Sequence, residues 1–220
     1  EVRVRTSVRN SEITIEAALE RLDPNARYTL RAQILDDGKA VKEFASAPFT
    51  SNDLKNGSLS ITEKWKAEKL WDAHTPGNTY QLGLSLKDAA GAVLDSALPV
   101  RFGYREFWIE GRDFFLNGTR IFLSCIPIDN GEIGAGSANY AAARETLERM
   151  KSFGINGVYT HNFGCEPGAH VGFAEILRAA ADVGMLVSFS QPHFGQYDWK
   201  APDAEQNNGY ARHAQFNTRM

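Results

Sequence analysis

The spacing of the hydrophobic residues changes once along this chain, near residue 105. Before that point, apolar residues stand at every second position, as in the runs 13–19, 28–34, 80–86 and 98–102. Alternation of this kind is typical of strands with one buried face. After about residue 135 the apolar residues recur at helical spacing, as in Tyr140, Ala143, Leu147 and Met150. The switch predicts a β domain followed by a domain of β/α units.

The first part of the chain predicts a β-sandwich. Turn sequences separate its alternating runs, at Asp23-Pro24-Asn25, Asp36-Asp37-Gly38, Asn56-Gly57, Pro76-Gly77-Asn78 and Ala90-Gly91. With a short strand at 41–44, about seven strands fit into about 105 residues, the dimensions of an immunoglobulin-type sandwich. No cysteine pair lies in this stretch. Its core therefore has to rest on apolar packing alone.

Two helix-glycine-strand units follow in succession. The expected helices end at Gly154 and Gly184, and each glycine is followed by an apolar strand, at 155–160 and 185–190. With residues 121–126 as the preceding strand, the order is β-α-β-α-β, with parallel strands and right-handed crossovers.

The spacing leaves open which parallel architecture these units build. A doubly wound sheet and a (β/α)8 barrel have the same local pattern. Neither GxGxxG after the first strand nor GxxxxGK[ST] occurs, so the usual signs of a nucleotide fold are missing and the barrel is preferred. Ser137 or Asn139 is the expected N-cap of the first helix, and residues 209–220 are expected to begin a third helix.

Composition narrows the classes of partner. The 220 residues are 43% hydrophobic and carry a formal net charge of -3, without a basic run. We therefore expect no nucleic acid and no membrane as partner. No apolar run approaches the roughly 20 residues that cross a bilayer, and residues 1–10 do not resemble a signal peptide. The compartment stays open, with a secreted or periplasmic location slightly favoured over a cytoplasmic one. A bridge between Cys125 and Cys165 also stays open.

Three sequence blocks between residues 70 and 123 carry a resemblance to a known family. Leu70-Trp71-Asp72, with Thr75-Pro76 and Tyr80, is similar to the run L-W-(S/D)-P-x-x-P-x-x-Y that closes the sandwich in glycoside hydrolase family 2, the β-galactosidase, β-glucuronidase and β-mannosidase family. Residues 100–106 read VRFGYRE and resemble its V-R-F-G-F-R-E strand, and residues 115–123 read FLNGTRIFL and resemble its F-x-L-N-G-K-P-I-F-L hairpin. The resemblance implies an immunoglobulin-like β-sandwich at residues 1–106, followed at residues 107–220 by the first β/α units of a (β/α)8 TIM barrel.

The same blocks also have a structural interpretation that needs no family. Asn117-Gly118, between the apolar runs 114–116 and 121–123, predicts a type I′ hairpin. Four large side chains are interpreted as packing between the two domains and not as contacts with substrate, namely Trp71, Phe102, Arg105 and Phe115. Asn56-Gly57-Ser58 and Asn117-Gly118-Thr119 match the glycosylation sequon as well, and both are interpreted as turns.

Polar and aromatic residues follow each of the three expected parallel strands. In a barrel, the loops after the strands build the active-site face. The candidate residues for binding sugar hydroxyls or stacking on a pyranose ring are Asp129, Asn130, His161, Asn162, Gln191, His193 and Trp199. The spacing of the histidines and Asp129 matches no metal-binding signature. We therefore expect neither a metal nor a cofactor.

The resemblance implies that this chain carries no catalytic residue. In the family, the two catalytic glutamates come from the ends of the fourth and seventh barrel strands, which lie beyond residue 220. The substrate motifs also depart from the family. Residues 124–130 replace its R-G-x-N-x-H-E run, residues 158–164 keep a histidine but lose the arginine of V-R-x-S-H-x-P, and residues 185–190 lack its Asp-Glu.

Two hypotheses about function follow. The chain is part of a glycoside hydrolase that acts on O-glycosidic bonds of a carbohydrate and is inactive alone, or it is a non-catalytic carbohydrate-binding or structural interaction protein on a glycosidase-like scaffold. Because three parallel strands leave an edge and an apolar face open, the missing C-terminal half of the barrel or a self-association partner is expected to cover them.

Overall fold

The computed structural model describes residues 1–128, 139–160 and 173–189. The chain divides into two compact units, Glu1–Ile121 and Phe122–Met220, and each is described by itself. The boundary expected between residues 106 and 107 stays a prediction. Within the described ranges, no helix has the length and apolar character needed to span a membrane.

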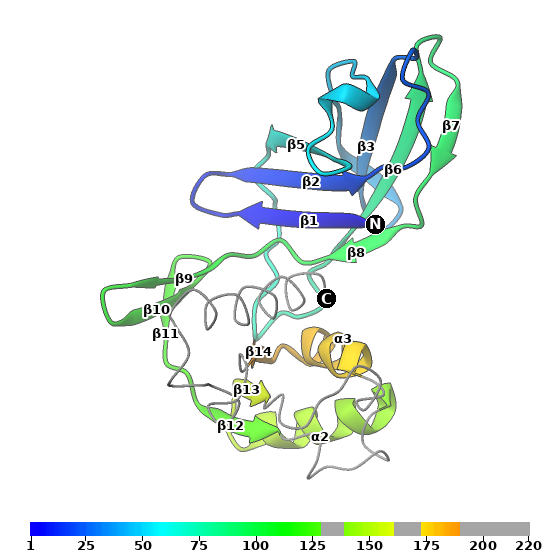
Figure 1. The fold of residues 1–220 in the computed structure, drawn as a ribbon. Helices are drawn as coiled ribbons and strands as arrows, with labels where there is room; N and C mark the ends of the chain where they lie inside the picture. The colour runs from blue at the N-terminus through cyan, green and yellow to red at the C-terminus, as the bar shows by residue number, and fades with distance from the viewer. Residues whose placement is uncertain (129–138, 161–172, 190–220) are drawn as a thin grey trace, which may run out of the picture. The chain divides into compact units, whose positions relative to one another are not determined.

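In the first unit, two antiparallel sheets share one core (Figure 1), and a smaller third sheet follows them in the chain. One sheet has the order β1-β2-β5, with β1 at Val2–Ser7, β2 at Glu12–Ala18 and β5 at Ser58–Lys64. The other has the order β4-β3-β6-β7, with β3 at Tyr28–Asp36, β4 at Lys39–Ala45, β6 at Tyr80–Asp88 and β7 at Val93–Ser96. A further strand, β8 at Val100–Phe102, pairs with the first residues of β6. The only helical element within residues 1–121 is the 3-10 turn η1 at Ser51–Asp53. The expected β-sandwich is confirmed.

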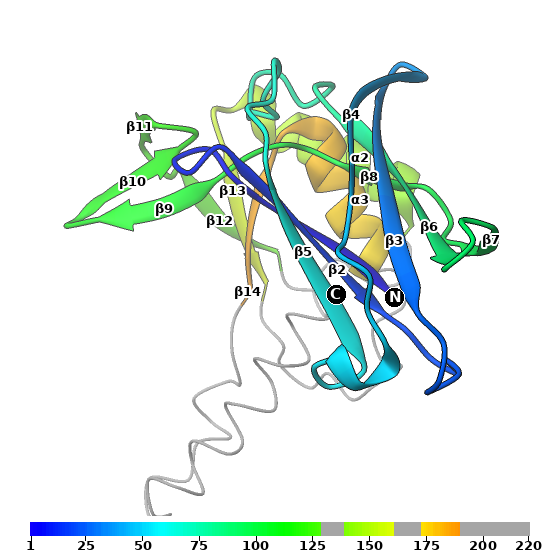
Figure 2. The same ribbon diagram turned by 90° about the horizontal axis from the view of Figure 1, so that it is seen from above.

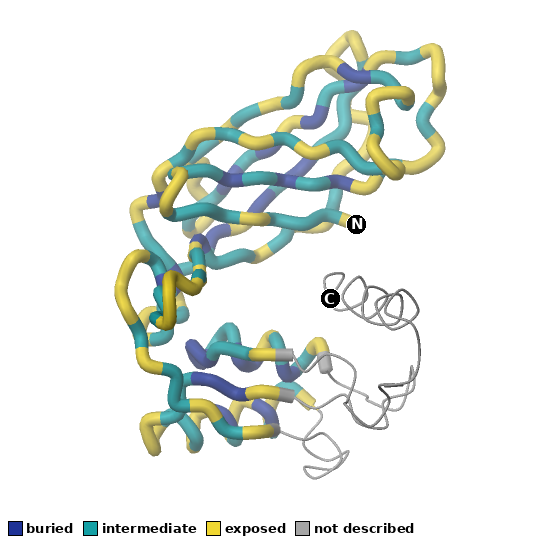
Figure 3. Tube along the Cα trace, turned by 60° about the vertical axis from the view of Figure 1, so that its left-hand side comes forward, coloured by how far each residue is buried: buried dark blue, intermediate teal, exposed yellow. Residues whose placement is uncertain are grey.

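The sandwich core follows from the alternation in the sequence. In β2 every second side chain is buried, at Ile13, Ile15 and Ala17. Figure 3 shows buried and less buried residues alternating along these strands. The buried residues of β3 and β6 are Tyr28, Leu30, Ala32, Ile34, Tyr80, Leu82 and Leu84. Each large apolar side chain of this kind contributes about 1.5–3 kcal/mol through burial, and no disulfide is needed to join the sheets.

The segment between β6 and β8 differs from the expected alternation. Leu98, expected in a strand over 98–102, is 87% exposed, because β8 begins only at Val100. Strand β7 has no alternating pattern, since Val93 and Leu94 are adjacent and both exposed. The register of β7 against β6 shifts at this point, as in a β-bulge. Bulges are common at exposed sheet edges, where they disfavour pairing with other chains.

The hydroxyl of Tyr104 ties three segments of the sandwich together. Tyr104 is 1% exposed. Its oxygen lies 2.9 Å from the carbonyl oxygen of Ser7, 3.0 Å from that of Glu12 and 2.8 Å from that of Trp65. These carbonyls belong to the end of β1, the start of β2 and the residue after β5. Burial raises the pKa of Tyr104 to about 12, although the contact with the Glu12 backbone lowers it.

A second anchor lies at Trp71, in the first of the three sequence blocks. Trp71 is 1% exposed, and its backbone N–H donates to the Tyr104 carbonyl at 3.0 Å. The guanidinium of Arg105 stands 4.1 Å above the indole ring. A Cβ added to Gly103 would lie only 2.5 Å from the Cβ of Trp71. Glycine is therefore required here for close approach. Trp71 and Arg105 pack within the first unit, and the expected packing between the two domains stays a prediction.

The hairpin after the sandwich forms a small antiparallel sheet of its own, in the order β11-β10-β9 (Figure 2). Its strands are β9 at Phe107–Glu110, β10 at Asp113–Leu116 and β11 at Thr119–Ile121. Asn117 and Gly118 connect β10 to β11 with φ of +53° and +91°, which matches the predicted type I′ turn.

The side-chain amide of Asn117 joins this hairpin to the sandwich. Its Oδ1 accepts a hydrogen bond from the Glu106 backbone N–H at 2.9 Å. Its Nδ2 donates to the Trp71 carbonyl at 2.8 Å. The backbone N–H of Asn117 also donates to the Glu106 carbonyl at 2.8 Å. One residue thereby holds the tip of the hairpin, the end of the sandwich and the buried tryptophan segment in a fixed arrangement.

Glu106 and Arg9 form a second link between the hairpin and the sandwich. The Glu106 carboxylate accepts hydrogen bonds from the backbone and Nε of Arg9, at 2.9 and 2.7 Å, and from the Ser7 hydroxyl at 3.1 Å. Burial alone would raise the pKa of Glu106, but these hydrogen bonds and the charge of Arg9 hold the pKa below its usual value. Arg9 also lies 4.6 Å from the centroid of the Trp108 ring, which stacks on Phe115.

The described residues of the second unit form three parallel strands and two helices (Figure 1). Its elements in chain order are β12 at Cys125–Ile128, α2 at Tyr140–Ser152, β13 at Gly157–Thr160, α3 at Phe173–Val183 and β14 at Leu186–Phe189. The sheet order is β12-β13-β14, as expected for a β-α-β-α-β segment. The first strand begins at Cys125 and not at residue 121, because Ile121 pairs with Phe114 in the preceding hairpin. The third helix expected at 209–220 lies outside the described residues.

The helix ends follow the expected capping residues. The side chain of Asn139 accepts a hydrogen bond from the Ala142 N–H at the start of α2. At the end of α2, Gly154 has a φ of +82° and the Ile155 N–H donates to the Met150 carbonyl, as in a Schellman cap. Gly184 ends α3 in the same way, with a φ of +80°. The core between the helices and the strands is formed by Ala143, Leu147, Val158, Ile176, Ala179, Ala180, Val183 and Met185.

We predict that Tyr104→Phe lowers the free energy of unfolding by about 1–3 kcal/mol, because buried carbonyls lose their donor. The wild-type chain should also lose stability as the pH rises from 10 towards 12. The folded state keeps the Tyr104 phenol protonated above its ordinary pKa of 10, so deprotonation favours unfolding in this window. Urea titrations at neutral and alkaline pH measure both effects. An alkaline loss of equal size in the variant would contradict the role of Tyr104.

We predict that Gly103→Ala destabilises the first unit by about 1–3 kcal/mol, because the added methyl overlaps the buried Trp71 side chain. Gly77→Ala is the matched control. A Cβ at Gly77 meets nothing within 4 Å, so this change should be neutral or stabilising by up to about 1 kcal/mol. Thermal unfolding of both variants measures the difference, and equal melting temperatures would refute the close packing at Trp71.

Candidate functional site

The candidate site is the edge at which the three parallel strands of the second unit end. Ile128 of β12 is paired with Thr160 of β13, and Thr160 is paired with Phe189 of β14. The last residues of the three strands therefore form one row across the sheet. In parallel β/α folds, this carboxyl edge is where ligands bind.

The predicted sugar-binding residues follow these strand ends in the sequence. Asp129 and Asn130 come directly after β12, His161 and Asn162 directly after β13, and Gln191, His193 and Trp199 after β14. All seven lie outside the described residues, as does Cys165. Their gathering at one site stays a prediction, which rests on the row of strand ends from which they continue.

Asn156 is a structural residue of this sheet that the sequence analysis did not single out. Its Oδ1 accepts a hydrogen bond from the Ser124 N–H at 2.8 Å, and its Nδ2 donates to the Phe122 carbonyl at 2.7 Å. Its backbone carbonyl accepts from the Leu186 N–H at 2.9 Å. Asn156 therefore bridges the amino ends of β12, β13 and β14 and fixes the register that aligns their carboxyl ends. In the sequence, the position of Asn156 between a helix-ending glycine and an apolar strand could have identified it.

The register of β12 against β13 also depends on a glycine. Gly157 is paired with Cys125, and a Cβ at Gly157 would lie 2.5 Å from the Cys125 Sγ. The thiol occupies the space that a side chain at residue 157 would need. The size of the side chain at residue 125 thus limits the size of the side chain at residue 157 when the two strands pair in this register.

The three strands themselves carry few side chains of the types that serve as acids, bases or metal ligands. The sequences of β12, β13 and β14 are CIPI, GVYT and LVSF, which contain no carboxylate or imidazole. Among the described residues, no group of three or more His, Cys, Asp and Glu side chains is placed to hold a metal ion. Any acid, base or sugar-binding group at this edge therefore has to come from the segments that follow the strands.

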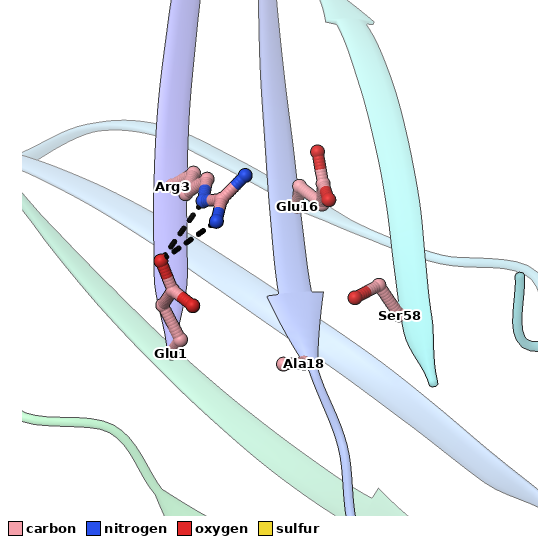
Figure 4. A pocket seen from close by; sticks show the side chains of 5 residues that line it. All are labelled: Glu1, Arg3, Glu16, Ala18 and Ser58. Carbon is pink, nitrogen blue, oxygen red and sulfur yellow. Dashed lines mark hydrogen bonds and ion pairs between the residues drawn. The ribbon is translucent and has the colours of Figure 1, made fainter. Parts of the chain in front are cut away.

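A shallow depression on the sandwich is too small to be an alternative site. It is lined by Glu1, Arg3, Glu16, Ala18 and Ser58 (Figure 4) and has a volume of about 30 Å³. Arg3 closes one side by donating to Glu1 at 2.9 Å. Pockets for small molecules measure about 300–1,000 Å³. The depression has room for one or two water molecules and not for a sugar ring.

Comparison with known proteins identifies relatives among the glycosidases. No family model matches the chain. It is 26% identical over 170 residues to a β-galactosidase of Priestia megaterium, an alignment that covers 73% of this chain and 16% of that protein. The chain thus spans about a sixth of the length of this curated relative.

Solved glycosidase structures share the fold. A β-glucuronidase from Ruminococcus gnavus in complex with a C6-substituted uronic isofagomine aligns with a TM-score of 0.63 at 18% identity, over 96% of this chain and 32% of its own. Bacteroides uniformis β-glucuronidase 2 aligns with a TM-score of 0.57 at 19% identity, over 86% of this chain and 22% of its own. A family 2 β-galacturonidase from Eisenbergiella tayi bound to galacturonate gives 0.56 at 18% identity, over 86% of this chain and 32% of its own.

These comparisons confirm the resemblance to glycoside hydrolase family 2 that the three junction blocks carry. At such low identities the structural matches show the fold alone. The relatives are hydrolases of glycosides, and the sandwich of this chain matches theirs.

We predict that Gly157→Ala destabilises the second unit by about 1–3 kcal/mol, because the new methyl overlaps the Cys125 Sγ. The double variant Cys125→Ala, Gly157→Ala should recover most of this loss, since the Cys125 Cβ lies 3.9 Å from the added atom. A coupling energy of about 0.5–3 kcal/mol is expected from the cycle of single and double variants, measured by denaturant unfolding. Additive effects would show that residues 125 and 157 do not face each other.

Proposed function

We propose that this chain is the sandwich and the first three β/α strands of a glycoside hydrolase of the family 2 type, which acts on O-glycosidic bonds of a carbohydrate. The observation that carries the proposal is the row of strand ends at Ile128, Thr160 and Phe189, each followed in the sequence by sugar-compatible side chains. The similarity to a β-galactosidase supports the same class of substrate. In this proposal β12, β13 and β14 are the first three strands of a (β/α)8 barrel.

The role proposed for this chain is substrate binding and not bond cleavage. A retaining glycosidase needs two carboxyl groups about 5–5.5 Å apart, one as acid/base and one as nucleophile. In the family, these are glutamates at the fourth and seventh strands, so the remainder of the barrel would supply them. Asp129, His161 and His193 would hydrogen-bond sugar hydroxyls on one side of the cleft, and Trp199 would stack on the ring.

The three-stranded sheet also supports the proposal that something further covers it. Among the described strands, both β12 and β14 lie at an edge in the order β12-β13-β14, and parallel sheets are normally covered on both faces. The missing barrel half, on the same polypeptide, is the first candidate. A second copy of the chain is the other candidate for covering the sheet. A secreted or periplasmic location is compatible with both candidates.

A second candidate function is a non-catalytic carbohydrate-binding or structural protein. The observation in its favour is the set of changed motifs, above all the absence of the family's His-Glu pair after the first strand, where Asp129 and Asn130 stand. The coding sequence beyond residue 220 separates the two functions. An Asn-Glu at the end of a fourth strand and a Glu at the end of a seventh support hydrolysis, and their absence favours the non-catalytic function.

We predict that in the full-length gene product His161→Ala and His193→Ala each lower kcat/KM about 5- to 100-fold, the effect of one lost hydrogen bond to substrate. A panel of p-nitrophenyl β-glycosides, including the galactoside, glucuronide and galacturonide, provides the assay. His74→Ala is the matched control, because His74 lies exposed in a loop of the sandwich. Equal activity of all three variants would refute the proposed cleft, and a full-length product that binds but does not cleave any glycoside would support the non-catalytic function.

A further inference from the structure

Two Asn-Gly turns of the same backbone type stand in different surroundings in the first unit. Asn56 and Gly57 have φ of +51° and +74°, close to the +53° and +91° of Asn117 and Gly118. Each pair forms the two central residues of a tight antiparallel turn. The φ angles are alike, but the contacts of the two asparagine side chains differ.

The side chain of Asn117 is held at both polar atoms. Its Oδ1 accepts from the Glu106 N–H and its Nδ2 donates to the Trp71 carbonyl, at 2.9 and 2.8 Å. Asn117 is half-buried. Asn56 and Gly57 are both exposed. Among the described residues, no hydrogen bond of the Asn56 side chain is present. Of these two asparagine side chains, only that of Asn56 can rotate without breaking a hydrogen bond.

We propose that Asn56 is a site of spontaneous deamidation and that the fold protects Asn117 from the same reaction. The backbone nitrogen of Gly57 attacks Cγ of Asn56, the Cγ–Nδ2 bond breaks, and ammonia leaves with the proton from the Gly57 nitrogen. Water then opens the resulting succinimide at either carbonyl and gives aspartate or isoaspartate. Glycine favours the attack because it has no side chain to hinder the nitrogen. The only co-reactant is water.

The same reaction would have unequal consequences at the two turns. At Asn56 it adds a negative charge to an exposed turn. At Asn117 it would replace the Nδ2 donor by a carboxylate oxygen that faces the Trp71 carbonyl, and the junction would lose a hydrogen bond and gain a repulsion. The hydrogen bonds that build the junction are thus the ones that prevent its chemical decay.

The experiment incubates the purified chain in mildly alkaline buffer and follows both sites by peptide mapping. Trypsin separates residues 56–64 from residues 113–120, and exchange of NH₂ for OH in each peptide is measured by mass against a sample digested at time zero. In the folded chain, we expect Asn56 to react at least about tenfold faster than Asn117, because an exposed turn opens more readily than a hydrogen-bonded junction. Asn56→Gln should abolish the early change in charge on ion exchange.

Two controls test whether the fold is the cause. In concentrated denaturant the two rates should converge, since the two sites share the Asn-Gly dipeptide. Gly103→Ala, which disturbs the packing at Trp71, should accelerate the loss of Asn117 and leave Asn56 unchanged; if this variant does not fold, the comparison of folded and denatured wild type decides alone. Equal rates in the folded chain would overturn the proposal, as would a difference that persists in denaturant.

Discussion

The side-chain amide of Asn117 determines how the sandwich passes into the hairpin. Its two hydrogen bonds join the Glu106 backbone and the Trp71 carbonyl, residues that are far apart in the sequence. Trp71 is in turn fixed by close contact with Gly103 and by the Arg105 guanidinium above its ring. Each of these contacts needs a particular residue type: an amide with both a donor and an acceptor, a residue without Cβ, and a planar cation. The three sequence blocks that resemble the glycosidase family are thus one connected set of contacts in the first unit.

A comparable constraint organises the second unit. Asn156 bridges the amino ends of the three parallel strands, and the pairing of Gly157 with Cys125 allows β12 and β13 to approach. The register set at this end places Ile128, Thr160 and Phe189 in one row at the other. The position of the candidate site is therefore decided by residues that are distant from it. This is the usual division in parallel β/α folds, where one end of the sheet stabilises and the other binds.

The fold could be predicted from the sequence wherever periodicity or turn chemistry was strong. The alternation at Ile13, Ile15 and Ala17 identified β2, and the glycines at 154 and 184 located the helix ends, because positive φ is costly for other residues. Two predictions failed where local pattern competes with pairing: Ile121 belongs to the hairpin, and Leu98 lies outside a strand.

The candidate site was less accessible to prediction. The end of the sheet at which the site lies follows from the parallel order of the strands. The structural role of Asn156, in contrast, is recognised only from contacts between segments distant in the sequence. Sequence periodicity also does not separate a closed barrel from an open sheet, because closure depends on how many strands follow. The seven sugar-binding candidates rest on the rule that ligands bind at the carboxyl ends of parallel strands.

The central claim is that the carboxyl edge of β12, β13 and β14 is one side of a sugar-binding cleft. A crystal structure of the full-length gene product with a glycoside or a sugar-shaped inhibitor tests it most directly. The account predicts a sugar at the ends of these three strands, with its hydroxyls within hydrogen-bond distance of Asp129, His161 or His193. A sugar bound on the sandwich, or at the opposite end of the parallel strands, would contradict it.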